Sequence, residues 1–465
     1  MKEIKNKWLE LVIVLSAPLL SVIDVFIINI AIPTIKKGTH ATDGEMQLVI
    51  AGYLMGYAAF LITGGRAGDH FGRKKVFFWG MFAFTITSCL CGMSESALQL
   101  NITRFFQGMS ASFMVPQTIA FIQILFTDVK ERAKAFGLYG ITLGTAAVIG
   151  QVLGGYLSDL HGMIEGWRLV FFINLPIGAL TLWATYRYVT ETPKHESTKF
   201  DYSGILILTL ALFALIYPLI QGREAGWPLW SFGLLLLSGL LFLWFSYDQK
   251  RKLANGAVPL IDVRLFQIKE FNMGLAAVLF HFMLHTAYLL LSAVYLQNGL
   301  GVSALDSGLY FIIPGILFIL SSVLASRLII RFGKKVLLVG VVLLFAAFYL
   351  QMLLWEPASG PVVVIGLMGI WGLGNGLVLP SLLNIALQNV PLAYAGAAAG
   401  IYSTFQQTAS ALGVSIIGGV FFYYSKDGWQ QAYHFGTIGL LICTFMVGLI
   451  LLLIPAKKSI RESAS

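Results

Sequence analysis

The chain has 465 residues, of which 57% are hydrophobic and 11% are charged, whereas ordinary soluble domains are about 25% charged. This composition excludes a soluble globular enzyme, and no polar stretch is long enough to form a separate soluble domain. The net charge of +9 would suggest nucleic acid as a partner of a soluble protein, but the distribution of Lys and Arg described below explains it better, and we expect no nucleic-acid partner.

Fourteen apolar stretches, most of them close to 20 residues long, are predicted to cross a membrane as helices. In chain order they cover residues 9–32, 46–65, 76–93, 98–126, 136–160, 169–189, 204–221, 230–247, 271–296, 305–330, 336–354, 362–387, 395–424 and 435–454. The expected fold class is therefore an all-α polytopic membrane protein embedded in a lipid bilayer. Cys89, Cys91 and Cys443 all lie in apolar stretches, so we expect no disulfide framework, no metal and no cofactor.

The loop charges predict the orientation of the chain. An even number of spans places both termini on one side of the membrane. With the N-terminus inside, the inner segments contain 25 Lys and Arg residues and the outer segments contain 5. Because inner loops are enriched in these residues, both termini are expected to be cytoplasmic, in a multi-pass protein of a plasma membrane that we expect to be bacterial.

Two weak repeats indicate an internal duplication. The segment 65–74 reappears in degraded form at 326–335, and the pair Gly108 and Pro116 reappears as Gly372 and Pro380. The two offsets, 261 and 264, are similar and occur in order. Transporters are often built from such repeats. The expected domains are an N-terminal six-helix bundle at 1–190, an inserted helix pair with a central cytoplasmic loop at 191–270, and a C-terminal six-helix bundle at 271–465.

Several short motifs lie within or beside the predicted spans. They are, in chain order, Asp24, Asn29, Ala31 and Pro33; Gly65, Asp69, Gly72, Arg73 and Lys74; Arg104, Gln107 and Gly108; Gly150, Gly154 and Gly155; Trp167, Arg168, Phe171, Asn174, Pro176 and Gly178; and Phe200, Asp201 and Gly204. In this order they resemble the major facilitator superfamily, specifically its fourteen-helix drug:proton antiporter branch. The resemblance implies proton-coupled efflux of small amphiphilic compounds, of the multidrug or antibiotic type, by alternating access. The expected partners are a small-molecule substrate and protons, and the expected state is a monomer.

One motif departs from this pattern. Gln151 follows Gly150 where the antiporter motif usually has proline, and Ala146 replaces an earlier glycine. The spacing of Gly150 and Gly154 also permits close helix packing without any further role. The sequence therefore leaves antiport, symport and uniport open.

Asp24 is the only acidic residue deep in any predicted span, and Arg104 is the only basic one. Intramembrane charges are costly and usually mark functional sites. Both residues lie at similar predicted depths from the outer boundary, which permits an ion pair. A protonation-sensitive Asp24–Arg104 pair is the sharpest mechanistic hypothesis, and purely structural hydrogen bonding and bracing of helix packing are the alternatives.

Further polar residues could line a substrate cavity. His281 and His285 are four residues apart and share a helix face, which permits cavity lining, a proton relay or ordinary interhelical hydrogen bonds. A metal site needs further ligands, and none is evident. The remaining candidates for proton or substrate contact are Asn29, Gln107, Gln151, Asn375, Gln406 and Gln407.

The loop after the second span is the candidate gate. Asp69 and Arg73 flank a turn at Gly72 and could join Asp128, Glu131 or Arg132 after the fourth span. The resemblance implies that Gly65, Asp69, Gly72, Arg73, Lys74, Asp128 and Arg132 belong to this gate. The alternative is that the basic residues serve only to orient the chain.

Several other functions compete with drug export. A symporter or facilitator that imports a metabolite is the nearest alternative. A membrane-embedded enzyme would need a nucleophile, metal or paired-acid site, and none is visible. A transporter-like sensor would usually add a soluble signalling domain. A primary pump is disfavoured because the sequence has no phosphate-binding loop of the Walker type.

Overall fold

The computed structural model describes residues 6–160, 162–191, 201–356, 358–387, 390 and 395–454. Regular structure in these ranges is helical, and fourteen helical stretches are long and apolar enough to cross a membrane. The predicted all-α polytopic fold and the predicted number of spans are confirmed.

The helices fall into three groups in chain order. The N-terminal half contains α1 (Lys7–Thr39), α2 (Asp43–Phe71), α3 (Arg73–Gly92), α4 (Ala97–Leu125), α5 (Val129–Ser158), α6 (Gly166–Phe172) and α7 (Asn174–Tyr188). The inserted hairpin contains α8 (Tyr202–Tyr217), η1 (Pro218–Gly222) and α9 (Leu229–Ala254), and η2 (Val263–Gln267) follows it. The C-terminal half contains α10 (Lys269–Asn298), α11 (Ala304–Tyr310), α12 (Ile312–Phe332), α13 (Lys335–Leu354), α14 (Pro361–Leu387), α15 (Ala395–Tyr424) and α16 (Trp429–Leu453).

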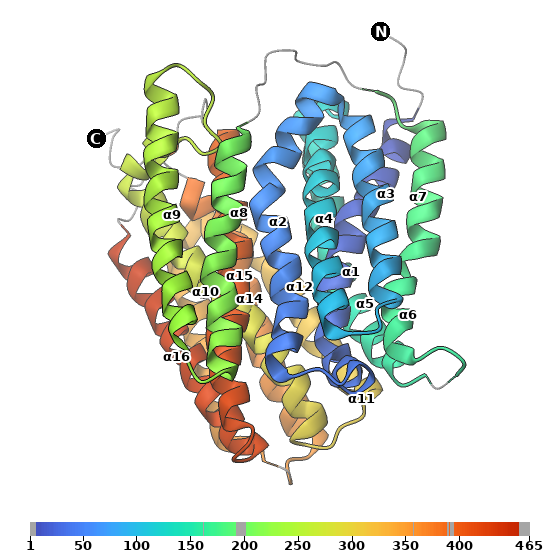
Figure 1. Ribbon diagram of the computed structural model, residues 1–465, viewed down its shortest axis with the longest axis vertical. Helices are drawn as coiled ribbons and strands as arrows, with labels where there is room; N and C mark the ends of the chain where they lie inside the picture. The colour runs from blue at the N-terminus through green and yellow to red at the C-terminus, as the bar shows by residue number, and fades with distance from the viewer. Residues whose placement is uncertain are drawn as a thin grey trace.

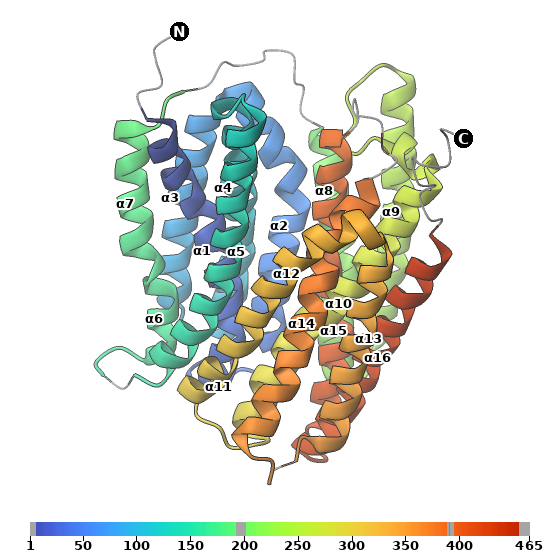
Figure 2. The same ribbon diagram turned by 180° about the vertical axis from the view of Figure 1, so that it is seen from behind.

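The two halves stand side by side with their helices running along one common direction (Figures 1 and 2). The start of α1 and the end of α16 lie toward the same end of the molecule, which we call the terminal side. The opposite end, which holds α11 and the loop between α5 and α6, is called the distal side. The inserted hairpin packs against α2 of the N-terminal half and α15 of the C-terminal half.

Proline residues account for the interruptions within three spans. A helical proline lacks an N–H group, and its ring crowds the carbonyl four residues earlier. Pro176 follows the break between α6 and α7 at Ile173, and Pro314 follows the break between α11 and α12 at Phe311. Pro218 begins the π-helical turn that ends the α8 span. The sequence predicted each of these spans as one continuous helix.

The first helix is longer than predicted. Its predicted end was residue 32, but α1 continues through Pro33 to Thr39, and His40 ends it in a left-handed conformation with φ of 51°. Lys36 lowers the hydropathy of this last part but does not disturb its backbone hydrogen bonds, and it forms an ion pair with Asp43 at 2.6 Å. Asp24 therefore lies near the middle of α1.

The repeated glycines occupy similar environments in the two halves. A Cβ atom on Gly108 of α4 would lie 1.9 Å from the carbonyl oxygen of Tyr53 on α2, and one on Gly372 of α14 would lie 2.3 Å from that of Pro314 on α12. Gly72 and Gly333, the other repeated pair, both adopt positive φ before α3 and α13. These positions use the close approach and the left-handed conformation that glycine permits.

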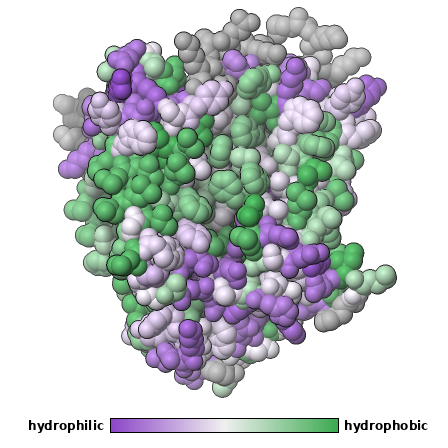
Figure 3. Space-filling view, in the orientation of Figure 1, coloured by the Kyte–Doolittle hydropathy of each residue, from purple (hydrophilic) through white to green (hydrophobic). Residues whose placement is uncertain are grey.

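The surface agrees with a membrane environment. Large apolar side chains such as Trp79, Leu236 and Leu243 are more than half exposed. A band of apolar residues crosses the face shown in Figure 3, with polar residues gathered toward both ends. A contiguous apolar surface of this kind is unfavourable in water and favourable against lipid chains.

At the distal side, the inserted hairpin contacts both halves through two adjacent residues. The Glu224 carboxylate accepts hydrogen bonds from the backbone N–H of Gly44 and, at 2.8 Å, from the hydroxyl of Thr42, at the start of α2. Arg223 donates to the carbonyl oxygen of Gly419 on α15 at 3.0 Å. The loop between α8 and α9 thus connects the two halves.

At the terminal side, Asp201 holds the hairpin together. Its carboxylate accepts hydrogen bonds from Lys252 at 2.5 Å, from Gln249 at 2.8 Å, and from the backbone N–H groups of Gly204 and Leu260. Burial by itself would raise the pKa of the Asp201 carboxyl, but these hydrogen bonds hold that pKa below its usual value of 3.8. Phe200, which precedes Asp201 in the motif, lies outside the described residues.

Candidate functional site

A buried ion pair between Asp24 of α1 and Arg104 of α4 forms the centre of the N-terminal half. The Arg104 side chain is 1% exposed and that of Asp24 is 0% exposed. Gln107 connects the two, because its amide nitrogen donates to Asp24 Oδ1 at 2.8 Å and its oxygen accepts from Arg104 Nη1 at 2.7 Å. Arg104 and Gln107 are three residues apart and therefore share one face of α4.

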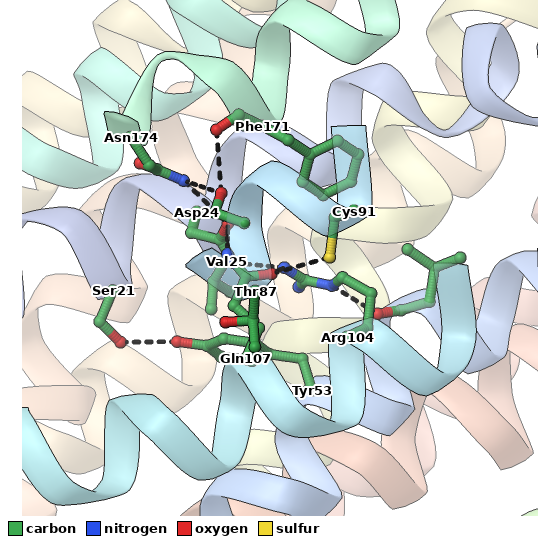
Figure 4. A network of polar contacts seen from close by, with 12 residues as sticks. Ser21, Asp24, Val25, Tyr53, Thr87, Cys91, Arg104, Gln107, Phe171 and Asn174 are labelled. Atoms are coloured by element: carbon green, nitrogen blue, oxygen red, sulfur yellow. Dashed lines mark hydrogen bonds and ion pairs between the residues drawn. The ribbon is translucent and has the colours of Figure 1, made fainter. Parts of the chain in front are cut away.

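Residues from the neighbouring helices complete this network (Figure 4). Asn174, at the start of α7, donates to Asp24 Oδ1 at 3.3 Å and to the Ser88 hydroxyl of α3 at 2.9 Å. Arg104 Nε donates to the carbonyl oxygen of Val49 on α2 at 3.0 Å. Five helices, α1, α2, α3, α4 and α7, thus contribute to the contacts around the pair. We call the side chains of Asp24, Ser88, Arg104, Gln107 and Asn174 the Asp24 network.

The Arg104 guanidinium also lies against an aromatic ring. Its Cζ atom is 4.4 Å from the ring centroid of Tyr53, and the Tyr53 hydroxyl is 2.8 Å from that of Ser21. Two opposite charges can remain buried when hydrogen bonds compensate for lost hydration. Here Arg104 Nε and Nη1 find acceptors, and both carboxylate oxygens of Asp24 find donors. Asn174 belongs to a motif visible in the sequence, whereas Tyr53 and Ser88 carried no signal that pointed to this site.

Asn29 does not join the network. Its side-chain nitrogen donates to the carbonyl oxygen of Val25 in the same helix at 3.2 Å, and its Oδ1 atom is buried without a partner in the described part of the chain. Asn29 lies five positions after Asp24, about 140° further around the helix, which places the two side chains on different faces of α1.

A second polar array lies in the C-terminal half. His281 Nε2 is 3.1 Å from Asn375 Oδ1, and the amide nitrogen of Asn375 is 3.2 Å from His285 Nδ1. The His285 ring stacks on Trp371, with centroids 5.8 Å apart. Asn375 on α14 thus sits between two histidines of α10. The Phe26 ring of α1 lies edge-on to His285 at 6.5 Å, so this array borders the interface between the halves.

Gln406 and Gln407 are half-buried on α15. The structure gives no hydrogen bond between either residue and the His281–Asn375–His285 array within the described ranges. Their neighbours Thr404 and Phe405 line a groove beside the inserted hairpin, which is described further below.

The candidate gate contains an ion pair between Asp69 and Arg73 at 2.5 Å. Gly72 between them has φ of 98°, and a Cβ atom there would lie 2.7 Å from the Glu191 carboxylate. The same carboxylate accepts from the backbone N–H of Lys74 at 3.1 Å. Glu191, which the sequence reasoning did not identify, is therefore part of this loop's environment. Gly65 is less constrained, since a Cβ atom there would be 3.9 Å from the nearest atom outside its own helix.

Asp128 and its neighbours have other contacts. The Asp128 carboxylate caps the start of α5 by accepting from the backbone N–H groups of Lys130 and Glu131. The Glu131 carboxylate pairs with Lys7 at 2.6 Å, and Arg132 is half-buried in the first turn of α5. A free N–H group at a helix start attracts a carboxylate strongly, which explains why Asp128 points to its own helix.

The glycines of α5 contact both halves. A Cβ atom on Gly154 would lie 2.6 Å from the carbonyl oxygen of Ile27 on α1, and Gly150 is similarly close to Ile23. Gly155 instead faces the C-terminal half, where a Cβ atom would lie 2.3 Å from the carbonyl oxygen of Ala304 on α11. The first two glycines therefore pack α5 within its own half, and the third packs it across the interface.

Gln151 lies in the same interface. A Cβ atom on Gly308 of α11 would lie 2.5 Å from the Gln151 carbonyl oxygen. The Gln151 side chain is 2% exposed, and both of its polar atoms have no partner among the described residues. Toward the terminal side α5 and α12 lie farther apart (Figure 2). A Cβ atom on Gly137 or Gly140 of α5 would meet no described atom within 4 Å.

Comparison with known proteins agrees with this architecture. Residues 14–414 match the family model of the major facilitator superfamily. The chain is 32% identical to a probable actinorhodin transporter of Streptomyces coelicolor, over 90% of this chain and 73% of that protein. It is 30% identical to the tetracenomycin C resistance and export protein of Streptomyces glaucescens, over 88% and 75%, and 30% identical to the puromycin resistance protein of Streptomyces alboniger, over 89% and 81%.

Solved structures share the fold at low identity. A bacterial homologue of the human lysosomal transporter Spinster superposes with a TM-score of 0.69 at 15% identity, covering 99% of this chain and 100% of that one. The xylose transporter XylE from E. coli, in an inward-open conformation, gives 0.67 at 15% identity and covers 97% of each chain. Fourteen membrane-spanning stretches, the helix-packing glycines and a match across most of its length all agree, and the chain belongs to the major facilitator superfamily.

Proposed function

We propose that this chain is a proton-coupled secondary transporter that exports small amphiphilic compounds of the antibiotic type by alternating access. The observation that carries the proposal is the buried Asp24 network, in which one carboxylate and one guanidinium are held by side chains from several helices. Relatives named for antibiotic resistance and export support the substrate class.

Helix α1 is the element that couples protonation to movement in this proposal. Asp24 lies on the face of α1 that packs inside the N-terminal half. Phe26, two residues later and therefore about 200° around the helix, lies beside His285 of the other half. Gln297 of α10 also donates to the Ile30 carbonyl oxygen of α1 at 2.9 Å. Protonation of Asp24 would leave Arg104 without its counter-charge, and repacking of the network would move α1 against α10.

The His281–Asn375–His285 array is proposed as part of the substrate-binding wall. Trp371 Nε1 and His281 Nδ1 are buried without partners in the described ranges, so each can hydrogen-bond to a ligand. The stacked rings of His285 and Trp371 supply an aromatic surface. This combination suits a neutral or singly charged aromatic amphiphile. Asn375→Ala is expected to raise the KM for such a substrate without changing its dependence on a pH gradient.

We further propose that the terminal side is cytoplasmic, because the predicted inner segments hold 25 of the Lys and Arg residues. The separation of α5 from α12 at that side then makes this state inward-facing. Both halves lie in one chain, so a monomer suffices for transport, and no catalytic role is invoked.

Transport into proteoliposomes tests the proposal. With puromycin as the probe, antiport predicts accumulation when the lumen is acidic, and Asp24→Asn is expected to abolish the effect of the gradient. Asp427→Asn, a change of an exposed loop carboxylate, is the matched control and should behave as the unmodified protein. Gradient-independent accumulation by the unmodified protein, or full coupling in Asp24→Asn, would contradict the proton role.

Symport is the second candidate, and Gln151 is the observation that favours it. Its amide replaces the proline expected in the antiporter motif and is buried at the interface of the halves. The same assay separates the two, because symport predicts accumulation when the lumen is alkaline. Gln151→Pro would then be expected to weaken symport and not antiport.

A further inference from the structure

A groove separates the inserted hairpin from the C-terminal half on the terminal side. Its volume is about 860 Å³, and its walls come from α8, α9, η2, α10 and α15. Phe242 and Phe245 of α9 and Phe405 of α15 are among its lining residues. The groove is distinct from the Asp24 network and from the His281–Asn375–His285 array, neither of which contributes a lining residue.

The depth of the groove corresponds to one leaflet of a bilayer. On α8 the lining residues reach Leu212, and on α10 they reach Leu279, each ten residues from the terminal-side start of its helix. At 1.5 Å per residue this is about 15 Å, which is half of a hydrocarbon core about 30 Å thick. A hydrocarbon chain entering from the terminal side would therefore end near the bilayer midplane.

The two ends of the groove differ in charge. Lys250 and Arg264 line its terminal end, where the lipid headgroups of that leaflet would lie. Arg264 is already paired with Asp262 at 2.7 Å, whereas Lys250 is exposed and forms no ion pair within the described ranges. The remaining walls are mostly apolar. This arrangement is complementary to a ligand with an anionic head and an apolar tail.

A buried polar group inside the groove also lacks a partner. Thr404 of α15 lines the groove and is 4% exposed, and its hydroxyl oxygen makes no hydrogen bond within the described part of the chain. A hydroxyl buried without a partner is costly, and an ester oxygen of a lipid, placed below the headgroup, can accept its hydrogen bond.

We propose that this groove binds an anionic phospholipid of the leaflet on the terminal side, with its phosphate at Lys250 and an acyl chain between α9 and α15. Basic pockets between membrane helices on the cytoplasmic side are a recognised setting for anionic headgroups. The bound lipid fills the groove between the inserted hairpin and the C-terminal half. Its binding does not depend on the proposed transport of antibiotics.

Native mass spectrometry of the purified chain, titrated with phosphatidylglycerol or phosphatidylcholine, tests this site. The unmodified protein is expected to retain phosphatidylglycerol in preference to phosphatidylcholine. Removing one interfacial positive charge weakens anionic lipid binding by about fivefold, so Lys250→Ala should lose most of the preference. Arg251→Ala is the matched control, because Arg251 is the exposed next residue of α9 and does not line the groove.

Ser246→Trp provides an independent measurement, because it places a bulky ring in the groove from an exposed position on α9. Retention of both lipids is expected to fall in this variant. Equal retention of the two lipids by the unmodified protein would overturn the proposal. Equal losses of phosphatidylglycerol retention in Lys250→Ala and Arg251→Ala would overturn it as well. So would a result in which puromycin competes for binding in the groove and phosphatidylglycerol does not.

Discussion

The stability of variants can distinguish the ion pair of Asp24 and Arg104 from an ordinary polar contact. Asp24→Asn leaves the Arg104 charge buried at 1% exposure without its counter-charge. Removing one partner of a buried pair costs about 3–5 kcal/mol. The remaining hydrogen bonds of Arg104, to Val49 and Gln107, cannot supply a negative charge. Asp24→Asn and Arg104→Gln should therefore each lower the free energy of unfolding by about this amount.

The double variant Asp24→Asn with Arg104→Gln is the decisive comparison. Replacing both charges by neutral groups of similar shape removes two desolvation costs together with their attraction, and the net effect is often neutral. The double variant should therefore be more stable than either single one, with a coupling energy of about 3 kcal/mol. Unfolding in mixed micelles with increasing SDS, followed by tryptophan fluorescence, measures all four proteins.

An additive result would refute this reasoning. If the effects of Asp24→Asn and Arg104→Gln simply sum within about 0.5 kcal/mol, the two charges do not stabilise each other in the protein. The double variant also isolates function from folding, because it is expected to be stable and yet to transport without responding to a pH gradient.

Three further predictions rest on the described contacts. Because hydrogen bonds hold the Asp201 pKa below 3.8, the stabilisation by this carboxylate is complete above that pH and is lost as the pH falls through the lowered pKa. The thermal unfolding midpoint of Asp201→Asn should thus lie below that of the unmodified protein by a constant amount from about pH 5 to 8, and an equal gap at about pH 2 would contradict the assignment. Gly108→Ala forces a Cβ atom to within 1.9 Å of a backbone oxygen of α2 and should cost about 1–3 kcal/mol in the same unfolding assay, whereas Gly140→Ala, with no described atom within 4 Å, should be neutral or slightly stabilising. In Gly72→Ala the new methyl group meets the Glu191 carboxylate at a φ of 98°, so transport should fall, and unchanged transport rates in proteoliposomes would argue against a gating role.

The sequence predicted the spans because each is an apolar stretch of about 20 residues, and because a helix forms all its backbone hydrogen bonds within itself. It also singled out Asp24 and Arg104, since a lone charge inside an apolar stretch is visible without a structure. It did not predict that Asn174 and Tyr53 would join them. Those contacts depend on which helices pack together and on their rotation, and no periodic pattern encodes either.

Loop and helix-end contacts were the least predictable. The end of α1 at Thr39 follows from backbone hydrogen bonding that continues beyond the apolar run, which hydropathy does not register. Glu191 reaches the candidate gate from the end of α7, more than a hundred residues along the chain. Asp128 was expected to join Asp69 and Arg73 at the gate. Among the described contacts its carboxylate instead caps the start of its own helix, which needs no long-range packing.

The loop of the inserted hairpin bears on the balance between the conformations of a transporter. Arg223 and Glu224 are neighbours in the chain, so their Cα atoms are about 3.8 Å apart whatever the two halves do. One binds α15 and the other binds the start of α2, and any motion that parts these helices at the distal side must break one of the two attachments. A hydrogen bond to a charged group is worth about 1.5–3 kcal/mol, which corresponds to a population ratio of about ten to a hundred and fifty. Two adjacent side chains of one loop can thus set how often the distal side opens.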